Sequence, residues 1–245
     1  MDLTRKIESA HFAAQGRLAR MGNYYRWILA NFEGFIGRRI WDAGAGIGSV
    51  SELLSERCDL LLATEFTESN MEALRERFAG REGVRVEFCD LAGDEALAFS
   101  GHDLDTVITL DVLEHLEDDA RALRIYYEVL RPGGHLLIKV PAHPFLYGTM
   151  DKASLHRRRY TKRELRAKLQ AAGFRVKRLR HMNLAATLPY LIKGRILKRE
   201  SNFSISIDGS KLGFYNRLMP WLERAERILP PPCGLSLVAV GEKDE

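Results

Sequence analysis

Short apolar runs alternate with helix-like segments along most of this chain, and this alternation limits the possible folds more than any other feature. The run at residues 60–64 is typical of a parallel strand that is buried on both faces. Strands that alternate with helices predict an α/β fold with a mostly parallel sheet and helices on both faces. We expect strands at residues 39–42, 60–64, 84–88, 106–110, 135–140, 174–180 and 234–241.

The segments between these strands predict helices, with one exception near the end of the chain. Thr161 and Glu164 form a capping-box pattern, which predicts that one helix begins there. The last two strands are instead separated by residues 184–232, which we expect to form an inserted helical cap. We predict one domain over residues 1–245, with helices in its first 36 residues. The expected helices are residues 5–35, 49–58, 69–78, 118–130 and 161–173.

The composition is that of an ordinary globular protein, with 46% apolar and 29% charged residues. The three cysteines, Cys58, Cys89 and Cys233, are far apart and form no CxxC pair, which favours a reducing compartment. We find no secretory signal and no run near the roughly 18 apolar residues that a membrane span needs. We therefore expect a cytoplasmic protein.

A glycine-rich turn at residues 42–48 joins the first strand to the next helix. Its glycines allow a ligand to approach the backbone closely, and the N–H groups at the helix start can bind a polar group. Glu65 ends the second strand, where a carboxylate can accept hydrogen bonds from ribose hydroxyls. Nicotinamide enzymes share this geometry, but they need a glycine where Ser49 stands. Asp90 ends the third strand, where it suits an adenine amino group.

Two further motifs follow, at residues 110–116 after the fourth strand and at residues 130–134 before the fifth. With the glycine turn, Glu65 and Asp90, their order and spacing resemble the class I S-adenosylmethionine (SAM)-dependent methyltransferases over residues 24–240. The resemblance implies a Rossmann-like fold with seven strands, of which the last is antiparallel. It also implies SAM as the cofactor and methyl transfer as the activity.

The same resemblance implies which residues hold SAM. The glycine turn would line the methionine part, Glu65 would hold the ribose, and Phe66 would pack on the adenine. Arg26 would reach the SAM carboxylate, or it is an ordinary solvated helix residue. The full set of implied cofactor-binding residues is Arg26, Asp42, Gly44, Ala45, Gly46, Gly48, Glu65, Phe66, Asp90, Leu91, Leu110 and Asp111.

Candidate catalytic residues follow the fifth strand, because a hydroxyl acceptor must lose a proton during transfer. We predict His143, Tyr147 and His156 in this role; the alternative is that the two histidines only hold the loop. This stretch resembles a bacterial type 11/12-like methyltransferase subgroup with the pattern VPAHP…LYG…D…H.RRY, often found with genes for cell-surface glycans or lipids. Leu155 departs from that pattern, which usually has glycine there. We expect His115 to shape a turn. Without an HExxH motif or cysteine cluster, we predict no metal site.

The charge is concentrated in residues 152–200, which hold 16 Lys and Arg but only 2 Asp and Glu. This segment can attract phosphate, acidic sugars, nucleic acid or an anionic membrane surface, or its charges are simply solvated. The same alternatives apply to Arg157, Arg158 and Arg159, which can grip an anion or form a solvated turn. By contrast, Phe214, Tyr215 and Trp221 fall at helical spacing, which favours a place in the core.

Three functions fit this sequence. We favour methyl transfer to a hydroxyl of a small molecule, such as a sugar, a lipid-linked glycan or a secondary metabolite, with peripheral membrane contact as an option. The second is an RNA or protein methyltransferase that uses residues 152–200, although no appended nucleic-acid module and no N/DPPY motif supports it. The third is a protein that binds SAM without catalysis.

Overall fold

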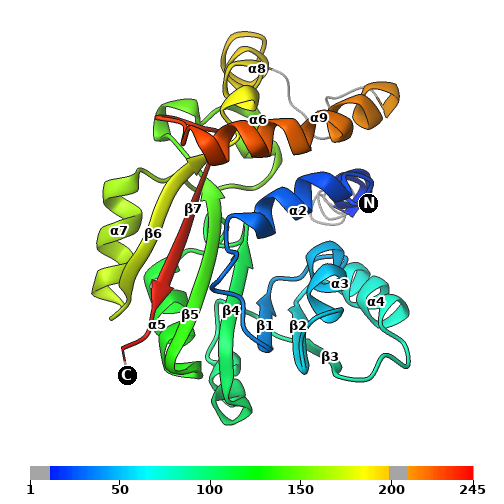
Figure 1. The fold of residues 1–245 in the computed structure, drawn as a ribbon, viewed down its shortest axis with the longest axis vertical. Helices are drawn as coiled ribbons and strands as arrows, with labels where there is room; N and C mark the ends of the chain where they lie inside the picture. The colour runs from blue at the N-terminus through cyan, green and yellow to red at the C-terminus, as the bar shows by residue number, and fades with distance from the viewer. Residues whose placement is uncertain (1–11, 199–208, 245) are drawn as a thin grey trace.

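The sheet confirms the predicted α/β architecture. A computed structural model describes residues 12–198 and 209–244. Strands β1 to β5 are parallel, and β7 is antiparallel to both β5 and β6. The spatial order is β3-β2-β1-β4-β5-β7-β6 (Figure 1). The strands are β1 (Arg39–Ala43), β2 (Leu60–Glu65), β3 (Val84–Phe88), β4 (Leu104–Leu110), β5 (Leu130–Pro141), β6 (Arg175–Met182) and β7 (Ser236–Glu242).

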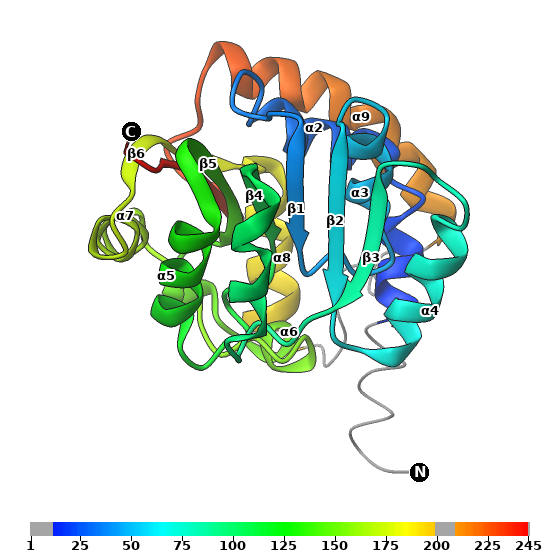
Figure 2. The ribbon, with the colours of Figure 1, turned by 90° about the horizontal axis from the view of Figure 1, so that it is seen from below.

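Helices cover both faces of this sheet, because successive strand side chains point in opposite directions and both faces are apolar. On β1, Trp41 packs into the cluster formed with helices α5 and α7 and the 3-10 helix η1, whereas Ile40 packs with α2, α3 and α9 (Figure 2). Helix α4 lies on the same side as α3. These elements are α2 (Gly22–Ala30), α3 (Ser49–Ser55), α4 (Glu68–Arg77), η1 (Glu95–His102), α5 (Asp119–Val129), α7 (Lys162–Ala171) and α9 (Gly209–Ile228).

Two predicted boundaries are wrong. The helix expected at residues 5–35 is broken before α2, where Met21 leaves the helical conformation (φ −99°, ψ 57°) and buries its side chain in the core; its first seven residues lie outside the described ones. Between β3 and β4, where a helix was expected without stated bounds, the 3-10 helix η1 buries Ala96 and Phe99. Strand β5 begins directly after α5, because Leu130 already pairs with Leu104 on β4.

The segment between β6 and β7 has two parts. Helices η3 (Leu184–Ala186), α8 (Thr187–Leu191) and the π-helix η4 (Ile192–Ile196) lie with α6 (Thr149–Ala153) beyond the carboxyl end of β5 (Figure 1). Helix α9 instead runs beside α2. The backbone N–H of Asn23 donates to Asn216 Oδ1 and its side chain donates to the Asn216 carbonyl, both at 3.0 Å. The second half of the predicted cap therefore covers the sheet.

The loop between β5 and α7 is anchored on α5 through the buried carboxylate of Asp119. Tyr160 Oη donates to Asp119 Oδ2 at 2.7 Å, and Lys168 Nζ donates to Oδ1 at 2.8 Å. Arg158 lies 3.3 Å from the same carboxylate. Asp119 is 2% exposed, so its charge is balanced inside the protein rather than by water.

We predict that Asp119→Ala lowers the free energy of unfolding by about 2–3 kcal/mol, because it leaves the buried Tyr160 hydroxyl and a cation without their partner. Urea unfolding at neutral pH measures this change. Glu117→Gln is the matched control, since the Glu117 side chain is 86% exposed. Equal effects of the two substitutions would contradict the anchoring role.

Candidate cofactor and acceptor site

A cavity of about 1410 Å³ opens at the carboxyl ends of the strands. Its position is where ligands bind in open α/β sheets, beside the point between β1 and β4 where the strand order reverses. Most of the predicted cofactor residues line it, but Arg26 and Gly48 are not among its lining. The predicted residues that line it are Asp42, Gly44, Ala45, Gly46, Glu65, Phe66, Asp90, Leu91, Leu110 and Asp111.

The glycine turn is held against β2 by its own backbone. The N–H groups of Gly44 and Ala45 both donate to the Thr64 carbonyl, at 3.1 and 2.9 Å. Gly44 has φ +84°, and a Cβ there would lie 2.5 Å from Val112 Cγ2, so only glycine fits. Gly48 serves another purpose, because a Cβ at that position would meet Leu74 and Phe78 of the α4 region at 2.9 Å.

Two acidic residues stand at the inner wall of the cavity. Glu65 is 6% exposed, and its carboxylate accepts hydrogen bonds from the backbone N–H groups of Gly46 (3.0 Å) and Phe66 (2.9 Å). Asp42 is 3% exposed and accepts a 2.6 Å hydrogen bond from Ser51 Oγ. Burial raises the pKa of Asp42 to about 6. Both carboxylates therefore have fixed orientations beside the turn.

Phe66 and Asp90 border the outer part of the same wall. The Phe66 side chain is 61% exposed, which leaves an aromatic face open to a flat ligand group. Asp90 is exposed and accepts a 2.9 Å hydrogen bond from the Ala92 N–H. A planar heterocycle with an amino group would fit between a stacking ring and this carboxylate.

The lining of the same cavity includes an ion pair that sequence analysis missed. Lys139 of β5 is 3% exposed, and its Nζ donates to Asp111 Oδ1 at 2.6 Å. Burial lowers the pKa of Lys139, but the adjacent Asp111 carboxylate raises it more, so the net shift is upward. A lysine inside the apolar run at residues 135–140 was the available signal.

The family comparison agrees with this geometry. Residues 41–136, which include the turn, Glu65, Asp90 and Asp111, match a methyltransferase domain model. This part of the chain is therefore similar to a methyltransferase domain. A ubiquinone biosynthesis O-methyltransferase of Aeromonas salmonicida (strain A449) is 29% identical over 112 residues, which are 46% of this chain and 47% of that protein. The chain thus spans about half the length of this curated relative.

Solved structures share the fold at low sequence identity. A SAM-dependent methyltransferase from Mesorhizobium loti superposes with a TM-score of 0.58 at 16% identity, covering 88% of this chain and 95% of the other. Phosphoethanolamine N-methyltransferase 2 of Haemonchus contortus, in complex with SAM, gives a TM-score of 0.59 at 18% identity, covering 95% and 57%. These similarities confirm the Rossmann-like methyltransferase fold.

The three predicted catalytic residues lie in different places. His156 and Tyr147 line the cavity, and Tyr147 Oη donates to the His156 carbonyl at 2.8 Å. His143 is not among the lining residues; its ring stacks on His181, with centroids 4.7 Å apart. Burial lowers the pKa of His143. The geometry therefore suits a loop-holding role for His143.

Glu114, His115 and His156 come together beside the cavity, which the two histidines line, whereas Glu114 is buried behind them. The Glu114 side chain is fully buried, and His156 Nε2 lies 3.8 Å from its Oε1. The rings of His115 and His156 meet edge to face at 4.9 Å. Burial, followed by the nearby Asp111 charge, raises the pKa of Glu114 well above its ordinary value. Sequence analysis had assigned His115 only a structural role.

The three consecutive arginines brace this wall instead of forming a solvated turn. Arg157 Nε donates to the His115 carbonyl at 3.0 Å, and Arg158 Nη2 donates to the carbonyls of residues 116 and 117 at 3.0 and 2.9 Å. Arg159 is buried and donates to Asp151 Oδ1 at 2.7 Å. Their hydrogen bonds hold the loop after β5 against the loop after β4.

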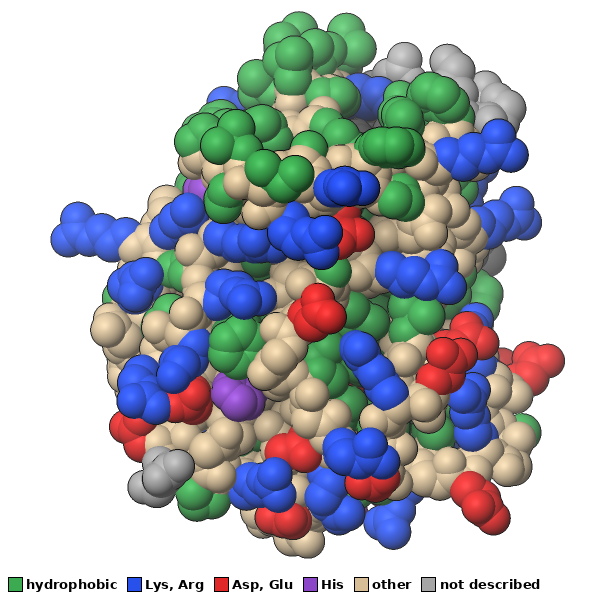
Figure 3. Space-filling model, in the orientation of Figure 1, with side chains coloured by type: hydrophobic (Ala, Val, Ile, Leu, Met, Phe, Trp, Pro, Cys, Tyr) green, Lys and Arg blue, Asp and Glu red, His purple; other side chains and the backbone are tan. Residues whose placement is uncertain are grey.

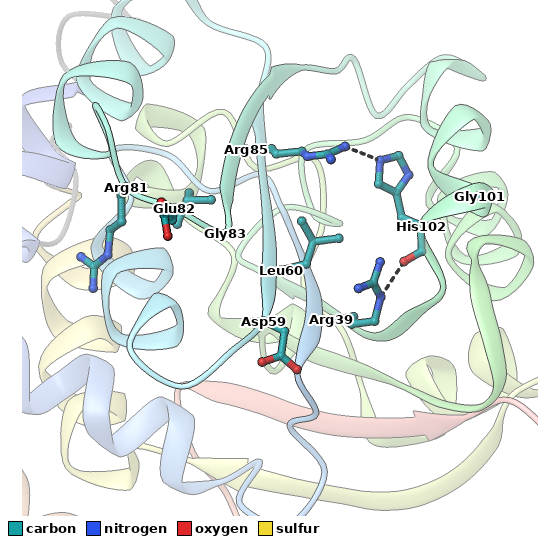
Figure 4. Close-up of a pocket in the computed structure, with 10 residues that line it drawn as sticks. Arg39, Asp59, Leu60, Arg81, Glu82, Gly83, Arg85, Gly101 and His102 are labelled. Carbon is teal, nitrogen blue, oxygen red and sulfur yellow. Dashed lines mark hydrogen bonds between the residues drawn. The ribbon is translucent and has the colours of Figure 1, made fainter.

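A second hollow, of about 620 Å³, lies at the opposite end of the sheet, where β1, β2 and β3 begin (Figure 4). Its polar groups are paired with each other: Arg39 Nε donates to the His102 carbonyl at 2.9 Å, and Arg85 Nη1 lies 3.3 Å from His102 Nε2. Because it lies away from the carboxyl ends of the strands, we do not assign the methyltransferase site to it.

We predict that Asp42→Asn removes a pH dependence from the stability of the ligand-free protein. The pKa of Asp42 in the folded protein, about 6, exceeds its ordinary value of 3.8. The contribution of Asp42 to the free energy of unfolding is therefore fully favourable below about pH 4 and is lost as the pH rises through 6. Above pH 7 the variant should be more stable than the wild type by about 2–3 kcal/mol. At pH 4 the two should be equal.

Urea unfolding between pH 4 and 8 measures this difference. The exposed Asp90→Asn variant is the control and should follow the wild-type curve. A difference between Asp42→Asn and wild type that stays constant over this range would show that Asp42 is not buried as the structure describes.

Proposed function

We propose that this protein transfers a methyl group from SAM to a hydroxyl of a small-molecule acceptor. One observation carries the proposal: the glycine turn, Glu65 and Asp90 share a single cavity with the loop that carries His156. Its volume of about 1410 Å³ exceeds the roughly 300–1,000 Å³ of a typical ligand pocket, so cofactor and acceptor fit together.

SAM would lie along the ends of β1, β2 and β3. The turn at residues 44–46 receives the methionine part, and the lone pairs of Glu65 that backbone N–H groups leave free accept the ribose hydroxyls. Adenine stacks on Phe66 with its amino group toward Asp90, while Leu110 and the Asp111–Lys139 pair form the floor. We assign no contact to Arg26, which is exposed and lies 3.4 Å from Asn23 Oδ1.

The acceptor hydroxyl would lie against His115 and His156, with the buried Glu114 behind them. Methyl transfer needs the attacking oxygen in line with the sulfur–methyl bond and needs the hydroxyl proton to leave. The two histidines offer imidazole nitrogens that can take this proton, and Tyr147 also lines the cavity. The relative named above is an O-methyltransferase, which supports oxygen as the attacking atom.

The acceptor side of the cavity favours a molecule with an apolar part. Helices α8 and α9 contribute Pro189, Tyr190, Leu218, Met219 and Leu222 to the lining. These side chains suit a lipid-linked or aromatic acceptor better than a free sugar.

The surface around this opening supports contact with an anionic lipid surface. Leu188, Ile196, Phe214 and Trp221 are 62%, 66%, 62% and 71% exposed. Tyr215 is 41% exposed, so the core position expected for the three aromatic residues is wrong. Figure 3 shows hydrophobic side chains gathered at this end of the molecule, with Lys and Arg side chains beside them. None of the described helices is long and apolar enough to cross a membrane. An apolar patch beside basic residues suits interfacial binding.

The RNA or protein alternative has less support, because much of the basic segment serves the fold itself. Arg159 pairs with Asp151 at 2.7 Å and Lys168 with Asp119 at 2.8 Å. Lys177 pairs with Glu242 at 3.1 Å. These cations are already neutralised, so they offer little attraction to a phosphate backbone.

We predict that Glu65→Ala and Asp90→Ala each weaken binding of S-adenosylhomocysteine (SAH) by roughly 10-fold, the loss expected for hydrogen bonds to a ligand. Isothermal titration calorimetry measures the affinity. Glu68→Ala, an exposed acid beside the same strand end, is the control and should bind like the wild type. Unchanged affinity in both test variants would refute the placement of SAM.

A methyl-transfer screen with labelled SAM tests the acceptor class. We expect turnover with phenols or lipid-linked glycans and none with RNA. Methylation of RNA, with a steep loss of activity as salt rises, would instead support the alternative function.

We also predict that Trp221→Ser and Leu188→Ser reduce binding to phosphatidylglycerol vesicles by about 5-fold or more, because each removes an apolar anchor. Vesicle co-sedimentation measures the bound fraction. Phe88→Ser is the control, since Phe88 is 60% exposed but lies on β3 at the far edge of the sheet. Equal binding by all three variants would show that the patch does not contact lipid.

A further inference from the structure

We propose that Glu114, His115 and His156 form a site for one divalent transition-metal ion on the cavity wall. Each residue offers one ligand atom, and these atoms all lie within 4.8 Å of one another. The two histidines line the cavity. The inference deepens the proposed function, on which it rests for the place of the acceptor, because the ion would lie where the acceptor hydroxyl is expected.

The buried Glu114 carboxyl group would need a cation beside it to be ionised, and the described residues do not supply one. Its side chain is fully buried, and neither of its oxygens has a hydrogen-bond partner among the described residues. Burying an unpaired carboxylate is costly. The nearby cations are committed elsewhere: Lys139 pairs with Asp111, and Arg159 donates to Asp151 and to the Ala142 carbonyl. The 3.8 Å separation from His156 Nε2 is too long for a hydrogen bond.

His156 is oriented as a metal ligand would be. Its Nδ1 lies 3.0 Å from Asp151 Oδ1, so Nδ1 carries the proton and Nε2 presents its lone pair toward Glu114. The Asp151 side chain is fully buried and is itself held by Arg159 Nε (2.7 Å) and the Gly148 N–H (2.9 Å). A carboxylate that fixes the far nitrogen of a histidine is typical of metal sites.

The donor set indicates which ions fit. Two imidazoles and one carboxylate suit Zn²⁺, Mn²⁺, Fe²⁺ or Co²⁺, whereas Ca²⁺ and Mg²⁺ prefer oxygen ligands. Bonds of roughly 2.0–2.2 Å place ligand atoms about 3–4 Å apart, so small side-chain rotations complete the site. Three protein ligands leave at least one coordination position for a further ligand from the cavity.

A metal ion here would activate the acceptor. Coordination lowers the pKa of a bound hydroxyl, which then loses its proton to solvent. The oxygen attacks the methyl carbon, the carbon–oxygen bond forms as the sulfur–carbon bond breaks, and the electron pair stays on sulfur to give neutral SAH. In this arrangement His156 acts as a ligand and does not itself take the proton.

Cobalt binding to the untagged full-length protein tests the site. After treatment with a chelator and dialysis, we expect one equivalent of Co²⁺ to bind and to give visible absorption bands of a histidine-ligated ion. His156→Ala and Glu114→Gln should each lower the affinity for Co²⁺ at least 10-fold. His181→Ala is the control, because that histidine stacks on His143 outside the cluster.

SAH calorimetry on the same variants separates this inference from the proposed function. Loss of Co²⁺ binding with normal SAH binding in His156→Ala supports the metal site. Co²⁺ affinity in His156→Ala equal to the wild type, or no stoichiometric binding by the wild type, overturns it even if SAH binds. Failure of the wild type to bind SAH would instead overturn the proposed function.

Discussion

The hydrogen bonds from the Gly44 and Ala45 N–H groups to the Thr64 carbonyl hold the site together. They fix the turn after β1 against the end of β2, so that the Glu65 carboxylate can accept from the Gly46 N–H. The turn is possible only because a side chain at position 44 would collide with Val112. One local backbone arrangement therefore positions the wall on which cofactor binding depends.

A second set of buried charges builds the opposite wall. Asp119 ties the loop after β5 to α5 and α7, and Asp151 ties His156 and Arg159 together within that loop. Because these carboxylates are shielded from water, their partners cannot exchange them for solvent at low cost. These buried charges therefore hold the loop after β5 in place beside the cavity.

Local sequence patterns were enough to predict the sheet and the residues proposed to bind the cofactor. The glycine turn, Glu65 and Asp90 each stand at a strand end, so the order of strands alone brings them together. Glu114 and His156 lie in different loops, and their contact depends on the packing of α5 and α7, which no local pattern reveals. His143 follows β5 directly, as the prediction required, but its ring stacks on His181 and does not line the cavity.

A crystal structure with SAH tests the central claim most directly. The account predicts SAH in the cavity at the carboxyl ends of the strands, with both ribose hydroxyls within hydrogen-bond distance of the Glu65 carboxylate and the adenine ring against Phe66. SAH bound elsewhere, or a glycine turn filled by side chains after soaking at saturating concentration, would contradict it.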